Sequence, residues 1–294
     1  MREKYISTLG QYLSAIQELK SYYPTGMFVN NPVVDEFLYR GLCDEAYELL
    51  PGVFREHIQE IEDREIKNKS YLSWTKEKNL LMSFVQEASA YLSIPTNQLY
   101  KWAEYAQHYG VPTRFLDWSR NPLVALYFAC RDKTDKDAVV WLLHQQNYVR
   151  FSMKGITAPN KAISEVINDL INEDSNFEYP LLYTPLYVDA RMSAQSSYFM
   201  VWGKKEEALE RMMSDDTLWM DLPEKDTGVR VFGQEQRVAS LFKFKIHADR
   251  KQPLLHELDM VGINEKTLFP GLDGIGRYIE RKHRFDYNEA LTHV

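Results

Sequence analysis

The stretch QHYGVPTRFLDW at residues 107–118, continued by SRNPLVALYFA at residues 119–129, decides the fold. Its glycine and first proline end a helical pattern at Tyr109. The alternation over residues 113–118 then predicts a β-strand. Ser119 is predicted to cap a helix that has a proline in its first turn and runs to about residue 131. This strand-to-helix corner indicates a protein in which helices pack on a sheet.

Strand and helix patterns alternate on both sides of this corner. We predict strands over residues 36–41, 138–143, 181–187, 198–202 and 241–246, and helices over residues 4–19, 77–92, 96–109, 161–171, 253–261 and 272–284. No linker rich in Pro, Gly or Ser interrupts the pattern. The predicted fold class is therefore α+β, a single domain with a mixed or antiparallel sheet core flanked by helices. Residues 1–30 are predicted as an N-terminal helical segment and residues 31–294 as the main domain.

The composition is that of an ordinary globular protein. The chain has 294 residues, of which 45% are hydrophobic and 26% charged, with a net charge of −7, so broad nucleic-acid binding is not expected. The two cysteines lack metal-ligand spacing, and we expect a reducing compartment and no metal. No run approaches the ~20 apolar residues of a membrane span. We therefore expect a cytoplasmic protein without a membrane partner.

The fingerprints of common nucleotide-binding and hydrolytic enzymes are absent from the sequence. There is no Walker-type glycine-rich loop, no G-x-S-x-G turn and no H-E-x-x-H helix. The richest cluster of polar side chains lies instead at the strand-to-helix corner, where the free N–H groups of a helix N-terminus could hold a phosphate. The candidates there are His108 and Asp117 for catalysis, and Gln107, Tyr109, Thr113, Arg114 and Trp118 for ligand binding.

Two other segments add candidate residues. The strand at residues 36–41 carries Tyr39 and Arg40, and the segment from residue 189 to residue 199 carries Arg191 and Gln195. An arginine offers a planar fork to paired oxygens, whereas a glutamine offers both a donor and an acceptor to a ligand amide or carbonyl. The alternative is structural, because such side chains also satisfy backbone groups. The 13% of aromatic residues includes several rings beside these arginines.

Four segments together carry a family resemblance. They are FLYRG at residues 37–41, the block at residues 107–129, RMSAQSSYF at residues 191–199, and GIN at residues 262–264 with LFPGLDG at residues 268–274. These segments resemble the FRG domain family, named for its Phe-x-Arg-Gly strand, which makes residues 31–294 an FRG-like domain. Tyr39 takes the aromatic place before the arginine, and Ser197 stands where the family usually has glycine. Family members resemble modules of bacterial and phage proteins, some of them associated with phage defence or toxin-like roles.

The order of elements also resembles that of ADP-ribosyltransferases. In that family an arginine on an early strand holds NAD, aromatic rings flank the nicotinamide, and a late glutamate orients a ribose hydroxyl. This weaker resemblance implies NAD as cofactor, with Arg40 contacting its diphosphate or ribose and Gln195 or Glu235 near the scissile glycosidic bond. The ring against the nicotinamide would come from Tyr109, Trp118 or Tyr127. A glutamine in the glutamate's place would make the chemistry slow or absent.

A noncatalytic binding module is the competing interpretation. In it Arg40, Arg114 and Arg191 converge on a nucleotide, a phosphate or an acidic partner peptide. Alternatively, these arginines pair internally with carboxylates such as Asp117 and Asp189. A nuclease is a third class, although no clear carboxylate cluster supports it. The expected partner is thus a nucleotide-type small molecule or a protein target.

Overall fold

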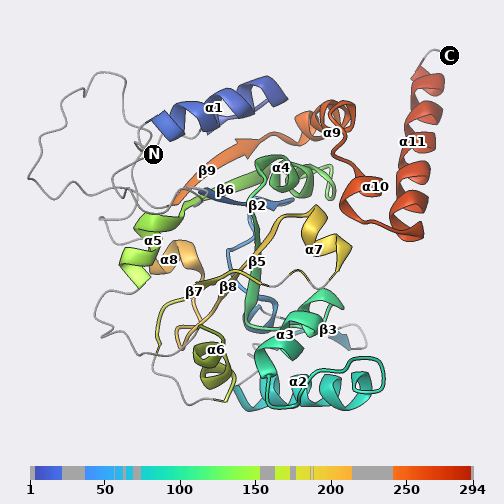
Figure 1. The fold of residues 1–294 in the computed structure, drawn as a ribbon. Coiled ribbons are helices and arrows are strands. Elements are labelled where there is room, and N and C mark those ends of the chain that lie inside the picture. The colour runs from blue at the N-terminus through green and yellow to red at the C-terminus, as the bar shows by residue number, and fades with distance from the viewer. Residues whose placement is uncertain are drawn as a thin grey trace, which may run out of the picture.

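A seven-stranded mixed sheet forms the centre of the molecule (Figure 1). The computed structural model describes residues 4–21, 37–55, 57–61, 64–68, 74–152, 163–172, 177–185, 187, 189–213 and 241–292. The strands lie in the order β1-β9-β6-β2-β5-β8-β7, and β1 runs parallel to β9 whereas the other neighbours are antiparallel. The structure therefore confirms the predicted α+β domain with a mixed sheet flanked by helices.

The elements follow the chain with few long gaps. The sheet contains β1 (Lys4–Tyr5), β2 (Phe37–Leu42), β5 (Phe115–Ser119), β6 (Ala138–His144), β7 (Leu181–Tyr183), β8 (Ser197–Val201) and β9 (Leu241–Ile246), and a separate hairpin contains β3 (His57–Ile61) and β4 (Arg64–Asn68). The helices are α1 (Leu9–Ser21), α2 (Trp74–Ala88), α3 (Leu99–His108), α4 (Pro122–Cys130), α5 (Gln145–Ser152), α6 (Ile163–Ile171), α7 (Ala190–Ala194), α8 (Leu209–Met212), α9 (Lys251–Met260), α10 (Glu265–Leu268) and α11 (Leu272–Thr292), with 3-10 turns η1 (Gly52–Phe54) and η2 (Ala248–Arg250).

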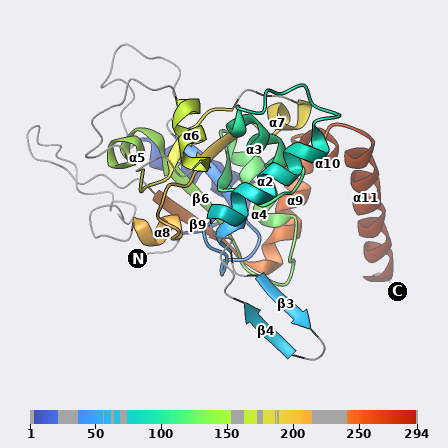
Figure 2. The ribbon, with the colours of Figure 1, turned by 90° about the horizontal axis from the view of Figure 1, so that it is seen from below.

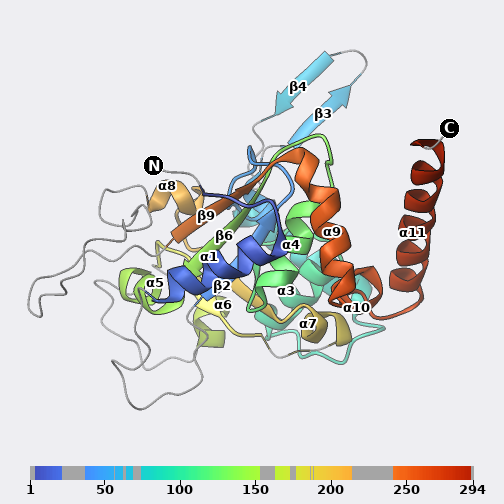
Figure 3. The ribbon, with the colours of Figure 1, turned by 90° about the horizontal axis from the view of Figure 1, so that it is seen from above.

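Three groups of buried side chains cover the sheet. Helices α1, α4 and α9 pack on one face over β2, β6 and β9, whereas η1 and α8 pack on the other face. Helices α3 and α6, with α2, bury a third group against β5, β7 and β8, and Figure 1 shows them at the opposite end of the molecule from α1 and α9. Figures 2 and 3 show the β3–β4 hairpin standing away from this body.

Gly41 lets helix α4 lie directly against β2. A Cβ added at Gly41 would come within 1.9 Å of the carbonyl oxygen of Ala125 and 2.6 Å of the amide nitrogen of Ala129. Both atoms belong to the helix backbone, which cannot move aside as the end of a side chain can. The glycine after Arg40 is thus explained by this close approach between a strand and a helix.

Strands β2 and β5 pair over only a short length. Tyr39 and Ser119 form their one residue pair, whereas β2 pairs with β6 along its whole length from Phe37 to Leu42. The carbonyl of Asp117, two residues before Ser119, therefore lies beyond the β2 ladder. The guanidinium of Arg40 reaches this carbonyl instead, with Nη1 donating to the oxygen.

Two local predictions need correction. The first residues of the expected helix over 4–19 form strand β1, because they pair with β9, and α1 begins at Leu9. Asn121, not Ser119, caps α4: its Oδ1 accepts from the amide of Leu123 at 2.9 Å. The Ser119 hydroxyl supports the cap from one step earlier by accepting from the amide of Asn121 at 3.0 Å.

Candidate functional site

Arg40 is held between the sheet strands without a carboxylate partner. Its Nη1 donates to the Asp117 carbonyl, and its Nε is buried and has no hydrogen-bond partner among the described residues. Burial lowers the pKa of Arg40 to about 10; the carboxylate of Asp117 opposes this shift and Arg55 adds to it. The guanidinium therefore stays charged at neutral pH while one of its donors lacks an acceptor, which is costly for a buried N–H group.

Asp117 presents an exposed carboxylate from the middle of β5. Gln107, at the end of α3, donates from Nε2 to Asp117 Oδ2 at 2.9 Å. The hydroxyl of Thr113 donates in turn to Gln107 Oε1 at 2.7 Å, which fixes the orientation of the amide. The chain from Thr113 through Gln107 thus holds the carboxylate in place, and these three residues, all predicted from the sequence, act together.

The charge around Asp117 is predominantly positive. Its carboxylate interacts electrostatically with Arg40, Arg55 and Arg191, and it counteracts the pKa decrease that burial causes in all three. Within the described ranges, none of the three arginines forms a direct ion pair with it. The Asp117 carboxylate thus acts electrostatically on three guanidinium groups without pairing with any of them among the described residues, and this excess of positive charge favours an additional anion. We call Arg40, Arg55, Asp117 and Arg191 the Asp117 centre.

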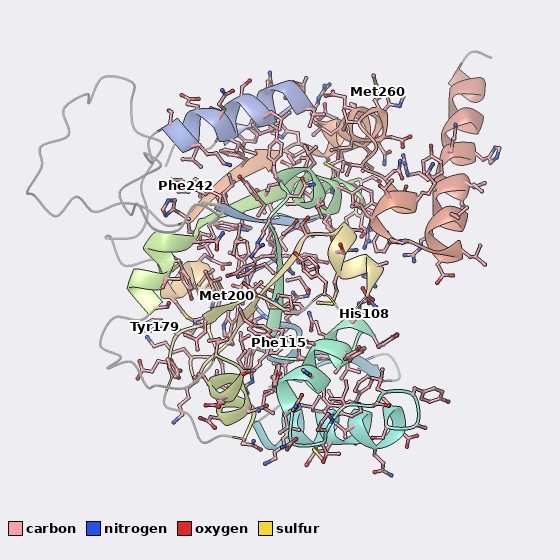
Figure 4. All side chains as sticks on the ribbon, in the orientation of Figure 1. His108, Phe115, Tyr179, Met200, Phe242 and Met260 are labelled. Atoms are coloured by element: carbon pink, nitrogen blue, oxygen red, sulfur yellow. The ribbon has the colours of Figure 1, made fainter. Side chains whose placement is uncertain are left out.

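His108 and Asp189 form a pair next to this centre. The His108 Nε2 and Asp189 Oδ2 atoms are 2.8 Å apart, and both side chains are partly exposed. The other carboxylate oxygen of Asp189 accepts from the amide of Met192 at 2.8 Å and so caps α7. Figure 4 shows His108 at the end of α3, directed towards α7. The cap fixes the carboxylate, and the carboxylate can orient the imidazole as a proton acceptor.

Arg114 lies in the core. It is 1% exposed, and its Nε lies 2.9 Å and 3.1 Å from the two carboxylate oxygens of Glu77. Its Nη2 also donates to Glu77, and its Nη1 donates to the Trp202 carbonyl at 3.2 Å. The partner is therefore Glu77 of α2, not Asp117, and of the two sequence interpretations the geometry fits internal pairing.

Gln195 also forms hydrogen bonds within the fold. Its Nε2 donates to the Leu268 carbonyl at 3.0 Å, which ties α7 to α10. Its backbone carbonyl accepts from the Ser119 hydroxyl at 2.7 Å, which ties it to β5. The amide donor that would orient a ribose hydroxyl is thus engaged. The other candidate for that position, Glu235, lies outside the described residues.

One comparison with known proteins decides the family. Residues 35–138 match the model of the FRG domain. The chain contains an FRG domain. Neither the curated proteins nor the solved structures contain a match to the chain. The matched residues run from just before β2 to the start of β6, so they include Arg40, Gln107, His108 and Asp117. Asp189 and Arg191 come from beyond the match and complete the Asp117 centre and its neighbouring pair.

The predicted aromatic residues lie at different depths in the FRG domain. Tyr39 is 2% and Trp118 is 2% exposed, whereas Tyr109 is 66% exposed. Tyr127 of α4, the third ring considered for the nicotinamide, is fully buried. Trp118 belongs to one buried group, and Arg40 lies two residues from Leu38 and Leu42 of that group, so both side chains are on the same sheet face, whereas the side chain of Asp117 is on the other. Its Nε1, like the Arg40 Nε, is buried without a hydrogen-bond partner among the described residues.

Sequence reasoning missed residues that flank the centre. Arg55 follows η1 and donates from Nε to the Leu50 carbonyl at 2.9 Å. Arg131 and Arg277 lie with Arg191 around the ring of Phe269. Phe269 stands inside a segment quoted for the family resemblance, but no local pattern indicated that arginines from three separate elements would surround it.

Within the described ranges, no group of three or more His, Cys, Asp or Glu side chains has a geometry that could hold a metal ion. A helix long and apolar enough to cross a membrane is likewise not found in the part of the chain that the structure describes.

Proposed function

We propose that the FRG domain binds an anionic, nucleotide-type ligand at the Asp117 centre. The observation that carries this proposal is the excess of guanidinium groups over carboxylates there, together with the buried, unpartnered Nε of Arg40. A buried charged donor without an acceptor costs free energy that a ligand oxygen would recover. Ligand binding would therefore recover free energy at Arg40 that it could not recover at an arginine whose donors are all paired.

NAD is the ligand that we propose for the site. It supplies phosphate oxygens for guanidinium groups and ribose hydroxyls for a carboxylate and an amide. Arg40 and Arg191 would contact acceptor oxygens, while Asp117, held by Gln107, would accept from a ribose hydroxyl. The buried Trp118 and the exposed Tyr109 offer rings on either side of the strand, of which only the exposed one can stack on a base without rearrangement.

Thermal unfolding with NAD and with ADP-ribose tests this proposal. We expect both to raise the Tm of the wild-type protein, because a ligand that binds only the folded state stabilises it. Arg40→Gln should abolish the shift while the free protein stays folded. The matched control is Arg211→Gln. Arg211 is an exposed arginine of α8 that pairs with Glu48 and does not belong to the Asp117 centre. An unchanged shift in Arg40→Gln, or no shift in the wild type, would overturn the proposal.

A second candidate function, consumption of NAD, is favoured by the exposed carboxylate of Asp117 and the oriented His108. In this reaction the bond between ribose C1 and the nicotinamide nitrogen breaks, and a water or a target hydroxyl adds to C1. Asp117 would stabilise the developing positive charge on the ribose, and His108 would take the proton of the attacking hydroxyl. Such an activity would account for a role in phage defence or as a toxin-like effector, by NAD depletion or ADP-ribosylation of a target.

Release of nicotinamide separates the enzyme from a binding module. For an enzyme, wild-type protein incubated with NAD releases nicotinamide, and Asp117→Asn lowers the rate by about 100-fold or more, which is the scale of losing one transition-state charge interaction. Binding of NAD without release, and without labelling of any protein in an extract, would leave the binding module. Stabilisation by an acidic peptide but not by NAD would replace the nucleotide with a protein partner.

A further inference from the structure

Three arginines surround the ring of Phe269. The guanidinium carbon of Arg277 lies 4.8 Å from the ring centroid, that of Arg191 lies 4.9 Å away, and that of Arg131 lies 5.7 Å away. They come from α11, from α7 and from the residue that follows α4. Phe269 is 6% exposed, because Tyr127 and Phe128 of the core pack against the ring as well as the guanidinium groups. We call these four residues the Phe269 cluster.

The cations in this cluster are incompletely neutralised. Arg131 donates from both Nε and Nη2 to the exposed Asp132 at 2.8 Å, whereas the one hydrogen bond of Arg277 among the described residues runs from Nε to the Asp273 carbonyl at 3.2 Å. Arg191 feels Asp117 and Asp189 as well as the two other arginines, which lower its pKa further. Like charges gathered on one ring repel each other, and the attraction of a ring for each cation is small at a partly exposed site. A bound anion would remove this repulsion.

The ring also orders the donors. A guanidinium that lies against an aromatic face has its flat side covered, so its N–H groups point outward from its edge. Three such groups around one ring offer paired donors from different directions. Phosphate oxygens accept paired N–H donors of this kind with good geometry. One carboxylate could satisfy a single fork, whereas a diphosphate has enough oxygens for all three.

We infer that the Phe269 cluster binds the diphosphate of the nucleotide-type ligand. The inference rests on the proposed function, because Arg191 belongs both to this cluster and to the Asp117 centre. Arg131 and Arg277, the two arginines of the cluster that do not belong to the Asp117 centre, then hold phosphate oxygens. Arg40 and Asp117 hold the ribose side of the same ligand. The diphosphate site thereby includes residues that lie outside the segment matched to the FRG domain.

Calorimetric titration with inorganic pyrophosphate tests this inference without any nucleotide chemistry. We expect the wild-type protein to bind pyrophosphate and Arg277→Gln to weaken binding at least tenfold. Arg277 is exposed, so this variant should unfold at the wild-type temperature. Arg191→Lys keeps the charge but loses the planar fork, and we expect an intermediate loss. Arg211→Gln, which removes an exposed arginine elsewhere, should leave the affinity unchanged.

The pyrophosphate titration and the thermal unfolding with NAD together separate the inference from the proposed function. Pyrophosphate binding that depends on Arg277, in a protein that NAD does not stabilise, would keep the cluster as a diphosphate site and discard NAD. Stabilisation by NAD that depends on Arg40, with pyrophosphate affinity equal in wild type and Arg277→Gln, would discard the cluster and keep the Asp117 centre. Binding of sulfate as tight as that of pyrophosphate would also contradict a diphosphate site.

Discussion

Arg40 and Arg114 are both strand-associated arginines that the sequence marks as ligand contacts, yet the structure gives them opposite environments. Arg114 is 1% exposed and holds both oxygens of Glu77 and the Trp202 carbonyl. Arg40 contacts only a backbone carbonyl, keeps a buried Nε without a partner among the described residues, and shares one carboxylate with Arg55 and Arg191. The difference indicates that Arg114 serves the fold whereas Arg40 is available to a ligand.

The largest effect should come from breaking the Arg114 pair. Glu77→Ala leaves a buried guanidinium without its carboxylate, and we expect the free energy of unfolding to fall by about 3–5 kcal/mol. Urea unfolding measures this change. Glu87→Ala removes an exposed carboxylate from the same helix and should change stability by less than about 0.5 kcal/mol. Equal effects of the two variants would mean that the Arg114 pair is not structural.

Lys251 offers a second, fully satisfied cation for comparison with Arg40. Its side chain donates to the carbonyls of Cys43, Asp132, Lys133 and Lys136 at 2.6–3.0 Å, and the residue is 0% exposed. Lys251→Met leaves those carbonyls without their donor, at a cost of about 3 kcal/mol. Lys282→Met on the exposed side of α11 is the control. A loss below about 1 kcal/mol for Lys251→Met would show that water replaces the ammonium.

Glu104 makes the region under α3 sensitive to pH. Burial raises the pKa of Glu104 from 4.5 to about 7, against a hydrogen bond from Tyr183 that lowers it. Between these two values the unfolded chain releases the proton and the folded chain keeps it, so stability falls as the pH rises, by about 3 kcal/mol in all. Above about 7 the loss is complete.

A neutral side chain at this position should remove the pH dependence. We expect Glu104→Gln to show a flat free energy of unfolding between pH 4.5 and 7, in urea titrations at several pH values, whereas Glu87→Gln keeps the wild-type slope. If wild type and Glu104→Gln had the same slope, the carboxyl would be ionised in the folded protein and its buried environment more polar than its 2% exposure suggests.

The smallest effect on stability should come from Arg40 itself. Arg40→Gln can still donate to the Asp117 carbonyl, and it removes a buried charge that no carboxylate neutralises directly. We therefore expect the free energy of unfolding to change by less than about 1 kcal/mol. Urea unfolding of Arg40→Gln and Glu77→Ala under the same conditions compares the two losses of unfolding free energy directly. A loss as large as that of Glu77→Ala would assign Arg40 to the fold and remove it from the site.

The sequence predicted the architecture better than the roles of single residues. Short apolar and aromatic runs identified β2, β5, β6, β8 and β9 closely, because strands buried on both faces, such as β6 and β8, leave a continuous hydrophobic signal. The cap at Asn121 was misplaced by two residues, since Ser119 and Asn121 both have capping side chains. The short helix α7 was not predicted, although it supplies Arg191 and begins at the cap formed by Asp189.

Pairing over long sequence distances limited the prediction of the site. Thr113, Gln107 and Asp117 are close in sequence, and the sequence placed all three at one polar corner without predicting the hydrogen bonds that join them. Whether an arginine faces a ligand or a carboxylate depends instead on partners 37 residues away for Arg114 and 77 residues away for Arg40. No local pattern carries that information, so the sequence could not tell the two arginines apart.

Titration of ADP-ribose into the wild-type protein and Arg40→Gln, with Arg211→Gln as control, tests the central claim most directly. The heat of binding should fit one site in the wild type and in the control. In Arg40→Gln, at the same folded fraction by circular dichroism, the affinity should fall at least tenfold, because the ligand loses its charged donor. Equal affinities in all three proteins, or no binding to the wild type, would contradict the assignment of Arg40 to a ligand site.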